Sequence, residues 1–116
     1  MRVLIVDDHP SFRASARTLL ESEGFEVVGE AEDGATAVRA AEKLQPDVVL
    51  LDVQLPDVDG FEVAEQLARL DSSLRIVLTS SRDRCDYGAC VAESSASGFV
   101  PKADLSVEAI SALVGS

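Results

Sequence analysis

The chain has 116 residues, 47% of them hydrophobic and 27% charged, a composition that is typical of a single folded domain and excludes a disordered chain. Its formal net charge of −11 argues against direct contact with nucleic acid, because phosphates are neutralised by clustered Lys and Arg side chains. No apolar run approaches the roughly 20 residues of a membrane-spanning helix, and the amino terminus lacks an apolar leader, so we expect a cytoplasmic protein with no membrane partner.

Five short apolar runs along the chain are predicted to be β-strands. Residues 48–52 are apolar until Asp52, which is typical of a central strand that is buried on both faces of a parallel sheet. Residues 25–31 alternate loosely between apolar and polar side chains, so we expect this strand at the edge of the sheet. In chain order, the predicted strands span residues 2–6, 25–31, 48–52, 75–79 and 98–100.

Between these strands, apolar side chains recur at helical spacing. Pro10 suits the first turn of the first helix, and Asp33 is predicted to cap the second. The fourth helix contains Cys, Tyr and Gly, which are weak helix formers, so we expect it to be a marginal, movable element. The predicted helices lie between Pro10 and Gly24, between Asp33 and Pro46, from Phe61 to Leu70, from Asp83 to about Ser94, and from Asp104 to Val114.

This alternation of strands and helices predicts an α/β fold of the (βα)5 type, with a parallel sheet, right-handed crossovers and helices on both faces. We expect one domain over residues 1–116, with no output domain in this chain. Cys85 and Cys90 fall on different faces of the fourth predicted helix, which argues against a disulfide or a metal-binding pair.

Carboxylates stand at the ends of two predicted strands. Asp7 and Asp8 follow the first strand, and Asp52 ends the third. Parallel neighbours lie about 4.8 Å apart, so these side chains would crowd into one pocket, where each would have a raised pKa unless a cation were present. Oxygen ligands of this kind suit Mg²⁺, which also accepts phosphate oxygens.

Two more strand ends carry polar groups. Hydroxyls of Thr79 and Ser80 follow the fourth strand, and Lys102 follows the fifth. With Asp52 these groups suit phosphoryl transfer: a carboxylate nucleophile, a hydroxyl that donates to a phosphoryl oxygen, and a lysine that neutralises charge. Each residue alone has an ordinary structural explanation, but their convergence at one edge indicates a site.

At this point the sequence resembles the receiver domain of two-component response regulators, over essentially its whole length. The matching segments are VLIVDDHPSFR, VVLLDVQLPDVDGFEVAEQL, RIVLTSS and SGFVPK. The resemblance implies a doubly wound, CheY-like sheet of strand order 2-1-3-4-5. It also implies a phosphoacceptor domain that takes a phosphoryl group from a histidine kinase onto Asp52 with Mg²⁺ bound. Such a domain catalyses only its own phosphorylation and slow dephosphorylation.

The resemblance also assigns roles to the metal site. Asp8 would contact the metal directly and Asp7 mainly through water, while Asp52 and the backbone carbonyl of Gln54 would complete the protein ligands.

In the same family, a hydroxyl and an aromatic residue form a switch. Ser80 fits the hydroxyl position best, with Thr79 as the alternative, and Lys102 matches the family's lysine. Phe99 matches the aromatic position. Phosphorylation would then change the face formed by the fourth helix, the fifth strand and the fifth helix, through which the domain could also form a homodimer.

Two segments, DDHP and GEAEDG, resemble the branch of the family that usually carries a carboxyl-terminal helix-turn-helix domain. An output domain is therefore an expected partner if the chain is a fragment. Ala103, and no proline, follows Lys102, and Ser95 stands where the family usually has glycine.

Three other functions are compatible with parts of the sequence. A haloacid dehalogenase-type phosphatase needs a second Asp two residues after its nucleophile, where this chain has Gln54 after Asp52 and His9 after Asp7. A flavodoxin-like FMN carrier needs hydroxyls and backbone donors after the first strand, where Asp7 and Asp8 would repel phosphate. A receiver-like interaction module without phosphorylation is the remaining alternative.

Overall fold

The computed structural model describes residues 1–71, 73–80 and 96–114. Its strands form one parallel sheet of five strands in the order β2-β1-β3-β4-β5, which confirms the predicted fold and strand order. The strands are β1 (Arg2–Val6), β2 (Glu26–Ala31), β3 (Val48–Asp52), β4 (Arg75–Ser80) and β5 (Gly98–Pro101).

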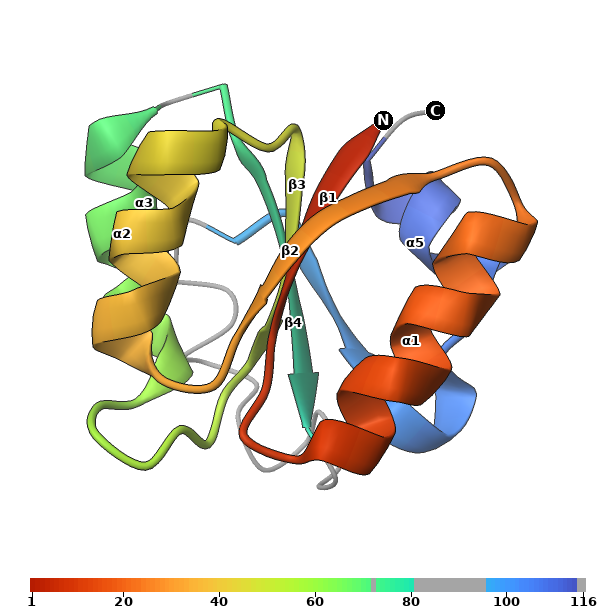
Figure 1. Ribbon diagram of the computed structural model, residues 1–116, viewed down its shortest axis with the longest axis horizontal. Helices are drawn as coiled ribbons and strands as arrows, with labels where there is room; N and C mark the ends of the chain where they lie inside the picture. The colour runs from red at the N-terminus through yellow and green to blue at the C-terminus, as the bar shows by residue number, and fades with distance from the viewer. Residues whose placement is uncertain (72, 81–95, 115–116) are drawn as a thin grey trace.

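Helices cover both faces of the sheet (Figure 1). On one side lie α2 (Gly34–Leu44) and α3 (Gly60–Leu70), and on the other lie α1 (Pro10–Ser22) and α5 (Val107–Val114). This arrangement is the doubly wound architecture that right-handed crossovers produce. Among the described residues, no helix has the length and apolarity needed to cross a membrane.

The central strand is buried as its sequence predicts. All of β3 is buried, because β1 and β4 flank it and helices cover both faces of the sheet. By contrast, β2 is an edge strand whose residues Glu26 and Glu30 are exposed while Val27 and Ala31 are buried. The placement of residues 25–31 at the edge is therefore confirmed.

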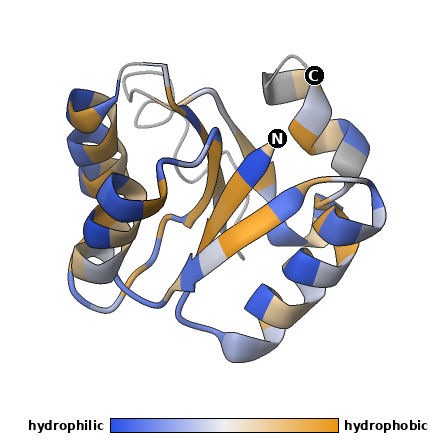
Figure 2. Ribbon diagram, turned by 45° about the horizontal axis from the view of Figure 1, so that its top comes forward, coloured by the Kyte–Doolittle hydropathy of each residue, from blue (hydrophilic) through white to orange (hydrophobic). Residues whose placement is uncertain are grey.

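Side chains alternate between two hydrophobic cores along each strand. Leu4, Val49 and Leu51 face α2 and α3, whereas Ile5 and Leu50 face α1 and α5. Figure 2 shows the apolar strands lying between helices whose outer faces are hydrophilic. Because alternate residues of a strand face the same side of the sheet, Asp52 lies on the same face as Leu50, the face covered by α1 and α5, where the core ends.

Capping residues fix the helix starts. Asp33 accepts a hydrogen bond from Thr36 N at 2.8 Å, so the predicted cap of α2 is confirmed. Asp59 does the same for α3, with Glu62 N at 2.9 Å. Gly24 follows α1 with φ of 91°, a left-handed conformation that glycine adopts without strain.

The final helix begins later than its sequence predicts. Residues Lys102–Asp104 form a 3-10 helix, Leu105 is extended, and α5 starts at Val107, not at Asp104. Ser106 Oγ accepts a hydrogen bond from Ala109 N at 3.1 Å, which caps the helix at that later point. The predicted fourth helix, which contains Cys85 and Cys90, lies outside the described residues, as does Ser95 after it.

The other boundaries differ by single residues. β2 begins at Glu26, β4 extends to Ser80, and β5 extends to Pro101. No peptide bond between described residues is cis, the bond after Lys102 included.

Candidate functional site

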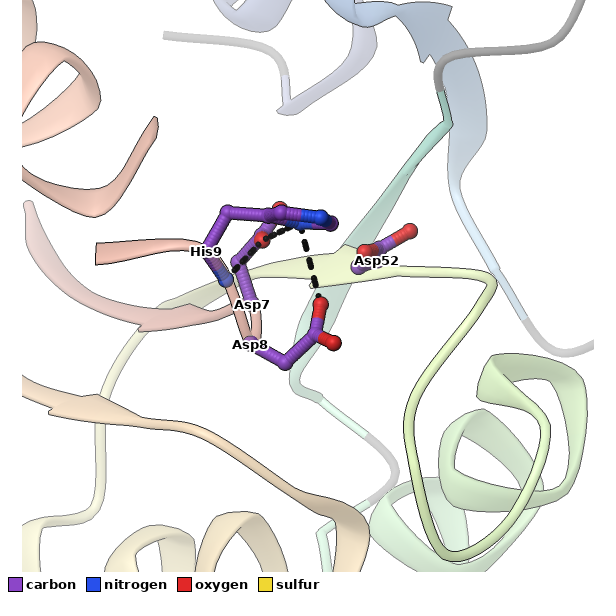
Figure 3. A group of neighbouring side chains, drawn as sticks. All are labelled: Asp7, Asp8, His9 and Asp52. Carbon is purple, nitrogen blue, oxygen red and sulfur yellow. Dashed lines mark hydrogen bonds and ion pairs between the residues drawn. The ribbon is translucent and has the colours of Figure 1, made fainter. Parts of the chain in front are cut away.

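The carboxyl ends of β1 and β3 meet at one edge of the sheet and bring a polar cluster together. Asp7, Asp8, His9 and Asp52 each place a potential ligand atom within 4.8 Å of the others (Figure 3). The cluster forms because Val6 pairs with Leu51 in the parallel register, so the residues that follow each strand emerge side by side. The predicted convergence of the three carboxylates is what the structure shows.

Asp7 lies at the bottom of the cluster and Asp8 at its rim. The side chain of Asp7 is fully buried, whereas 36% of the Asp8 side chain is exposed. Oδ1 of Asp7 accepts a hydrogen bond from His9 N at 2.8 Å, and Nδ1 of His9 lies 3.0 Å from Oδ1 of both aspartates. Asp8 therefore has the more open carboxylate of the pair.

Asp52 ends β3 with only 3% of its side chain exposed. Oδ1 accepts a hydrogen bond from Gln54 N at 3.0 Å, and Oδ2 accepts one from Lys102 Nζ at 3.4 Å. Burial raises the pKa of Asp52 and the charge of Asp7 adds to the effect, while the bonds from Gln54 and Lys102 oppose it. The carboxylate is thus a buried base that further positive charge would stabilise.

Lys102 connects the two buried carboxylates. Its Nζ lies 2.7 Å from Oδ2 of Asp7, in addition to its longer bond to Asp52. The ammonium also lies 4.5 Å from the centre of the Phe12 ring on α1, a cation–π contact. With 16% of its side chain exposed, the lysine reaches into the site from the 3-10 helix after β5.

The two hydroxyls that the sequence singles out lie beside Asp52. Thr79 is the register partner of Asp52 on β4, and Ser80 follows it; both are fully buried. Thr79 Oγ1 has no hydrogen-bond partner among the described residues. Phe99 pairs with Leu78 on the next strand and packs against the core under α2 and α3, so the aromatic position lies one strand away from the hydroxyls.

The loop from β3 to α3 is held tightly against Asp52. Gln54 forms an isolated antiparallel bridge with Asp59, and Gly60 N donates to Val53 O at 2.6 Å. A Cβ atom at Gly60 would collide with the carbonyl oxygen of Asp52 and would come within 2.7 Å of Val53 Cα. Only glycine fits there, because the neighbours are backbone atoms that cannot turn away.

The donor set fits a hard divalent cation. Three carboxylates lie together and one ammonium contacts two of them, Asp7 and Asp52, which leaves an excess of negative charge in a largely buried pocket. Oδ2 of Asp7 accepts no hydrogen bond of regular geometry from the described residues, although the ammonium of Lys102 lies 2.7 Å away and partly offsets its charge. Oxygen-rich sites of this kind suit Mg²⁺.

Sequence reasoning missed four residues that shape this edge. They are His9, Phe12, Arg13 and Gly60, none of which the sequence predicts as a site residue. Arg13 Nη1 donates to the carbonyl oxygen of Asp7 at 2.6 Å and its Nε lies 3.1 Å from Glu30, so it fixes the turn after β1. The adjacency of His9 to an acidic pair was the one available signal.

Comparison with known proteins gives a family match. Residues 3–113 match the family described as response regulator receiver domain. BvgA of Bordetella pertussis, described as a virulence factors putative positive transcription regulator, is 38% identical over 111 residues, which cover 96% of this chain and 53% of the relative. EvgA of Escherichia coli, a DNA-binding transcriptional activator, is 38% identical over 102 residues, 88% of this chain and 50% of the relative. The chain thus spans about half the length of these curated relatives.

Solved structures agree in fold. A two-component response regulator of the LuxR family from an Aurantimonas species superimposes with a TM-score of 0.89 at 34% identity, covering 98% of this chain and 84% of that one. The signal receiver domain of the putative response regulator NarL from Mycobacterium tuberculosis gives 0.84 at 33% identity, covering 99% of this chain and 97% of that one.

Proposed function

This chain belongs to the response regulator receiver domain family, and from that premise we propose that Asp52 accepts a phosphoryl group from a histidine kinase in a step that requires Mg²⁺. A role in two-component signalling follows from the family itself. The observation that carries the chemical proposal is the position of Asp52: a buried carboxylate at the end of β3, next to the acidic pair after β1 and bonded to Lys102.

The proposed reaction is a displacement at phosphorus. An oxygen of Asp52 attacks the phosphoryl group, a P–O bond forms, and the P–N bond to the kinase imidazole breaks, with its electron pair leaving on the imidazole nitrogen. The hydrogen bond from Gln54 N holds one oxygen of Asp52 in place. Charge that builds on the phosphoryl oxygens is neutralised by Lys102, which already lies within reach of the carboxylate.

The metal ligands in this proposal come from both strand ends. Asp8 would hold the ion directly, because it has the more exposed carboxylate, and Asp7 would act mainly through water. Asp52 and the Gln54 carbonyl would be the other protein ligands. When bound, Mg²⁺ would offset the charge of the phosphoryl oxygens and of the clustered carboxylates. Catalysis by this domain is confined to its own phosphorylation and slow dephosphorylation.

We further propose that phosphorylation is sensed by the hydroxyl and aromatic residues on β4 and β5. Ser80, or Thr79 as the alternative, donates to a phosphoryl oxygen, and Phe99 changes its packing in response. The support is spatial: Thr79 is paired with Asp52 in the sheet, and Phe99 with Leu78 on the neighbouring strand. The output face would include β5 and α5, and a second copy could dock there as a homodimer.

DNA binding is proposed only for an output domain joined to this receiver. The relatives BvgA and EvgA are transcription regulators about twice the length of the matched region. The receiver itself carries 21 acidic and 10 basic residues, a balance that does not suit contact with phosphates.

The proposal is tested by intact mass spectrometry after incubation with acetyl phosphate and Mg²⁺. Wild-type protein should gain the mass of one phosphoryl group, and the gain should be lost with EDTA, with Asp52→Asn and with Asp8→Ala. Asp71→Asn, which changes an exposed aspartate between α3 and β4, is the matched control and should label normally. Labelling of Asp52→Asn at the wild-type rate would contradict the assignment.

A further inference from the structure

The loop between β3 and α3 is attached to α2 by the side chain of Asp57. Its carboxylate accepts hydrogen bonds from Gly34 N at 2.8 Å and from Ala35 N at 3.1 Å. Both N–H groups belong to the first turn of α2, where no backbone acceptor is available and where the helix dipole favours a negative charge. The carboxylate therefore joins the loop to a helix turn that is far away in the chain, since Gly34 and Ala35 precede Asp57 by 23 and 22 residues.

Helix α2 has a cap of its own. Asp33 accepts the hydrogen bond from Thr36 N at 2.8 Å, in the ordinary position for a capping aspartate. Asp57 accepts hydrogen bonds from the two preceding N–H groups, those of Gly34 and Ala35, which are not bonded to Asp33. The main result of its bonds is thus the attachment of the loop to the helix.

A second contact reinforces the first. A Cβ atom at Gly34 would lie 2.5 Å from Cγ2 of Val58 and 2.9 Å from Cγ2 of Val63. Glycine at this position lets the residue after Asp57 lie directly on the first turn of α2. The tip of the loop is therefore fixed by hydrogen bonds and by packing at the same place.

The near end of the same loop forms part of the proposed phosphorylation site. Gln54 N donates to Oδ1 of Asp52 at 3.0 Å, and Gln54 is bridged to Asp59 across the loop. Asp57 lies between these bridged residues in the chain, so a shift of the tip would be transmitted to the backbone of Gln54.

We propose that Asp57 is a positioning residue for the metal and phosphoryl site, because its attachment to α2 holds the backbone of Gln54 against Asp52. The inference rests on the proposed function, in which the Gln54 carbonyl is a metal ligand. Asp57 does not touch the ion or the phosphoryl group; it acts through the loop. Partners of metal ligands commonly influence metal affinity in this indirect way.

The test compares Asp57→Ala with Asp57→Asn in Mg²⁺ titrations of the whole chain, followed by the amide chemical shifts of residues 52–60. Asp57→Ala should bind Mg²⁺ about tenfold more weakly than wild type. Asp57→Asn keeps an oxygen that accepts from Gly34 N, so it should retain most of the affinity. Both variants remove the same negative charge. If only the long-range attraction between this charge and Mg²⁺ were lost, the Mg²⁺ affinity of the two variants would fall equally.

Two further measurements separate positioning from general damage. Amide exchange at Gly34 and Gln54 should accelerate in Asp57→Ala and stay near wild type in Asp57→Asn, while far-UV circular dichroism shows both to be folded. Ala35 N loses its acceptor oxygen in both variants, because the amide nitrogen of asparagine cannot accept a hydrogen bond. Asp71→Ala is the matched control: its carboxylate bonds locally to Ser73, between α3 and β4, and its Mg²⁺ affinity should equal that of wild type.

The outcomes distinguish this inference from the proposed function. Wild-type affinity in Asp57→Ala, or equal weakening in the alanine and asparagine variants, would overturn the positioning role while the metal site stands. The proposed metal step requires that wild type binds Mg²⁺ and that Asp8→Ala abolishes this binding. If either result is not obtained, the metal step fails and the inference fails with it.

Discussion

Nζ of Lys102 lies 2.7 Å from Oδ2 of Asp7, so the lysine that we assign to the phosphoryl group forms its shortest contact with a carboxylate of the metal site. Its bond to Asp52 is longer, at 3.4 Å. A cation bound between the carboxylates would compete with the ammonium for Asp7, since both neutralise the same charge. Metal binding and the freedom of Lys102 to approach a phosphoryl group are therefore coupled in our account.

Removal of the lysine should destabilise the fold. Lys102→Met leaves two buried carboxylates without their ammonium, and we expect the free energy of unfolding to fall by about 2 kcal/mol at neutral pH. Urea denaturation in the absence of Mg²⁺ measures this loss. Lys43→Met, at an exposed position in the last turn of α2, is the control and should change little. Equal stability of the two variants would show that Lys102 does not stabilise Asp7 and Asp52.

The buried charge of Asp52 should cost stability. The pKa of Asp52 in the folded protein is raised above its ordinary value of 3.8. Between pH 3.8 and the folded-state pKa, the folded protein therefore binds more protons than the unfolded chain, and its stability falls as pH rises through that range. Asp52→Asn removes this cost, so the variant should be more stable than wild type without Mg²⁺ at about pH 7, with a smaller gain below about pH 4. Thermal unfolding across this range measures the difference, and a pH-independent difference would contradict the raised pKa.

The ring of Phe12 should help to hold Lys102. Phe12→Leu removes the face on which the ammonium lies, and we expect a loss of about 1 kcal/mol in unfolding free energy and a slower reaction with acetyl phosphate. Phe25→Leu is the matched control, because Phe25 packs on the same core just before β2. If both variants were phosphorylated at the same reduced rate, the effect would belong to the core and not to the lysine.

A side chain at position 60 should damage the site directly. Gly60→Ala forces the backbone of Asp52 and Val53 to move, so we expect a loss of about 2 kcal/mol in stability and strongly reduced phosphorylation. Gly29→Ala on β2 meets mainly the flexible end of Leu44, at 2.7 Å, and should be milder. Urea denaturation and acetyl phosphate labelling of both variants provide the comparison. Normal labelling of Gly60→Ala would show that the loop tolerates the shift.

Much of this site could be predicted because it depends on short-range sequence patterns. Apolar runs that end on Asp7 and Asp52 define strand ends, and parallel strands bring their carboxyl ends together whatever the details of packing. The position of Lys102 after the fifth strand followed from the same rule, although the 3-10 helix in which it lies was not predicted.

The remaining features depend on contacts between distant segments, which a single sequence does not display. Phe12 reads as an ordinary core residue of a helix, and its role beside Lys102 arises only when α1 packs next to the end of β5. Asp57 reads as a turn residue, although its bonds lead to α2. The close approach of Gly60 to Asp52 is likewise invisible until the loop is folded.

The central claim is that Asp52 is the phosphoacceptor and that the reaction needs Mg²⁺. It is tested most directly by treating the protein with acetyl phosphate, reducing the acyl phosphate with borohydride and locating the product by peptide mass spectrometry. We predict a homoserine in place of Asp52, formed with Mg²⁺ and absent with EDTA. Reduction products at another aspartate, or an equal yield with EDTA, would contradict the account.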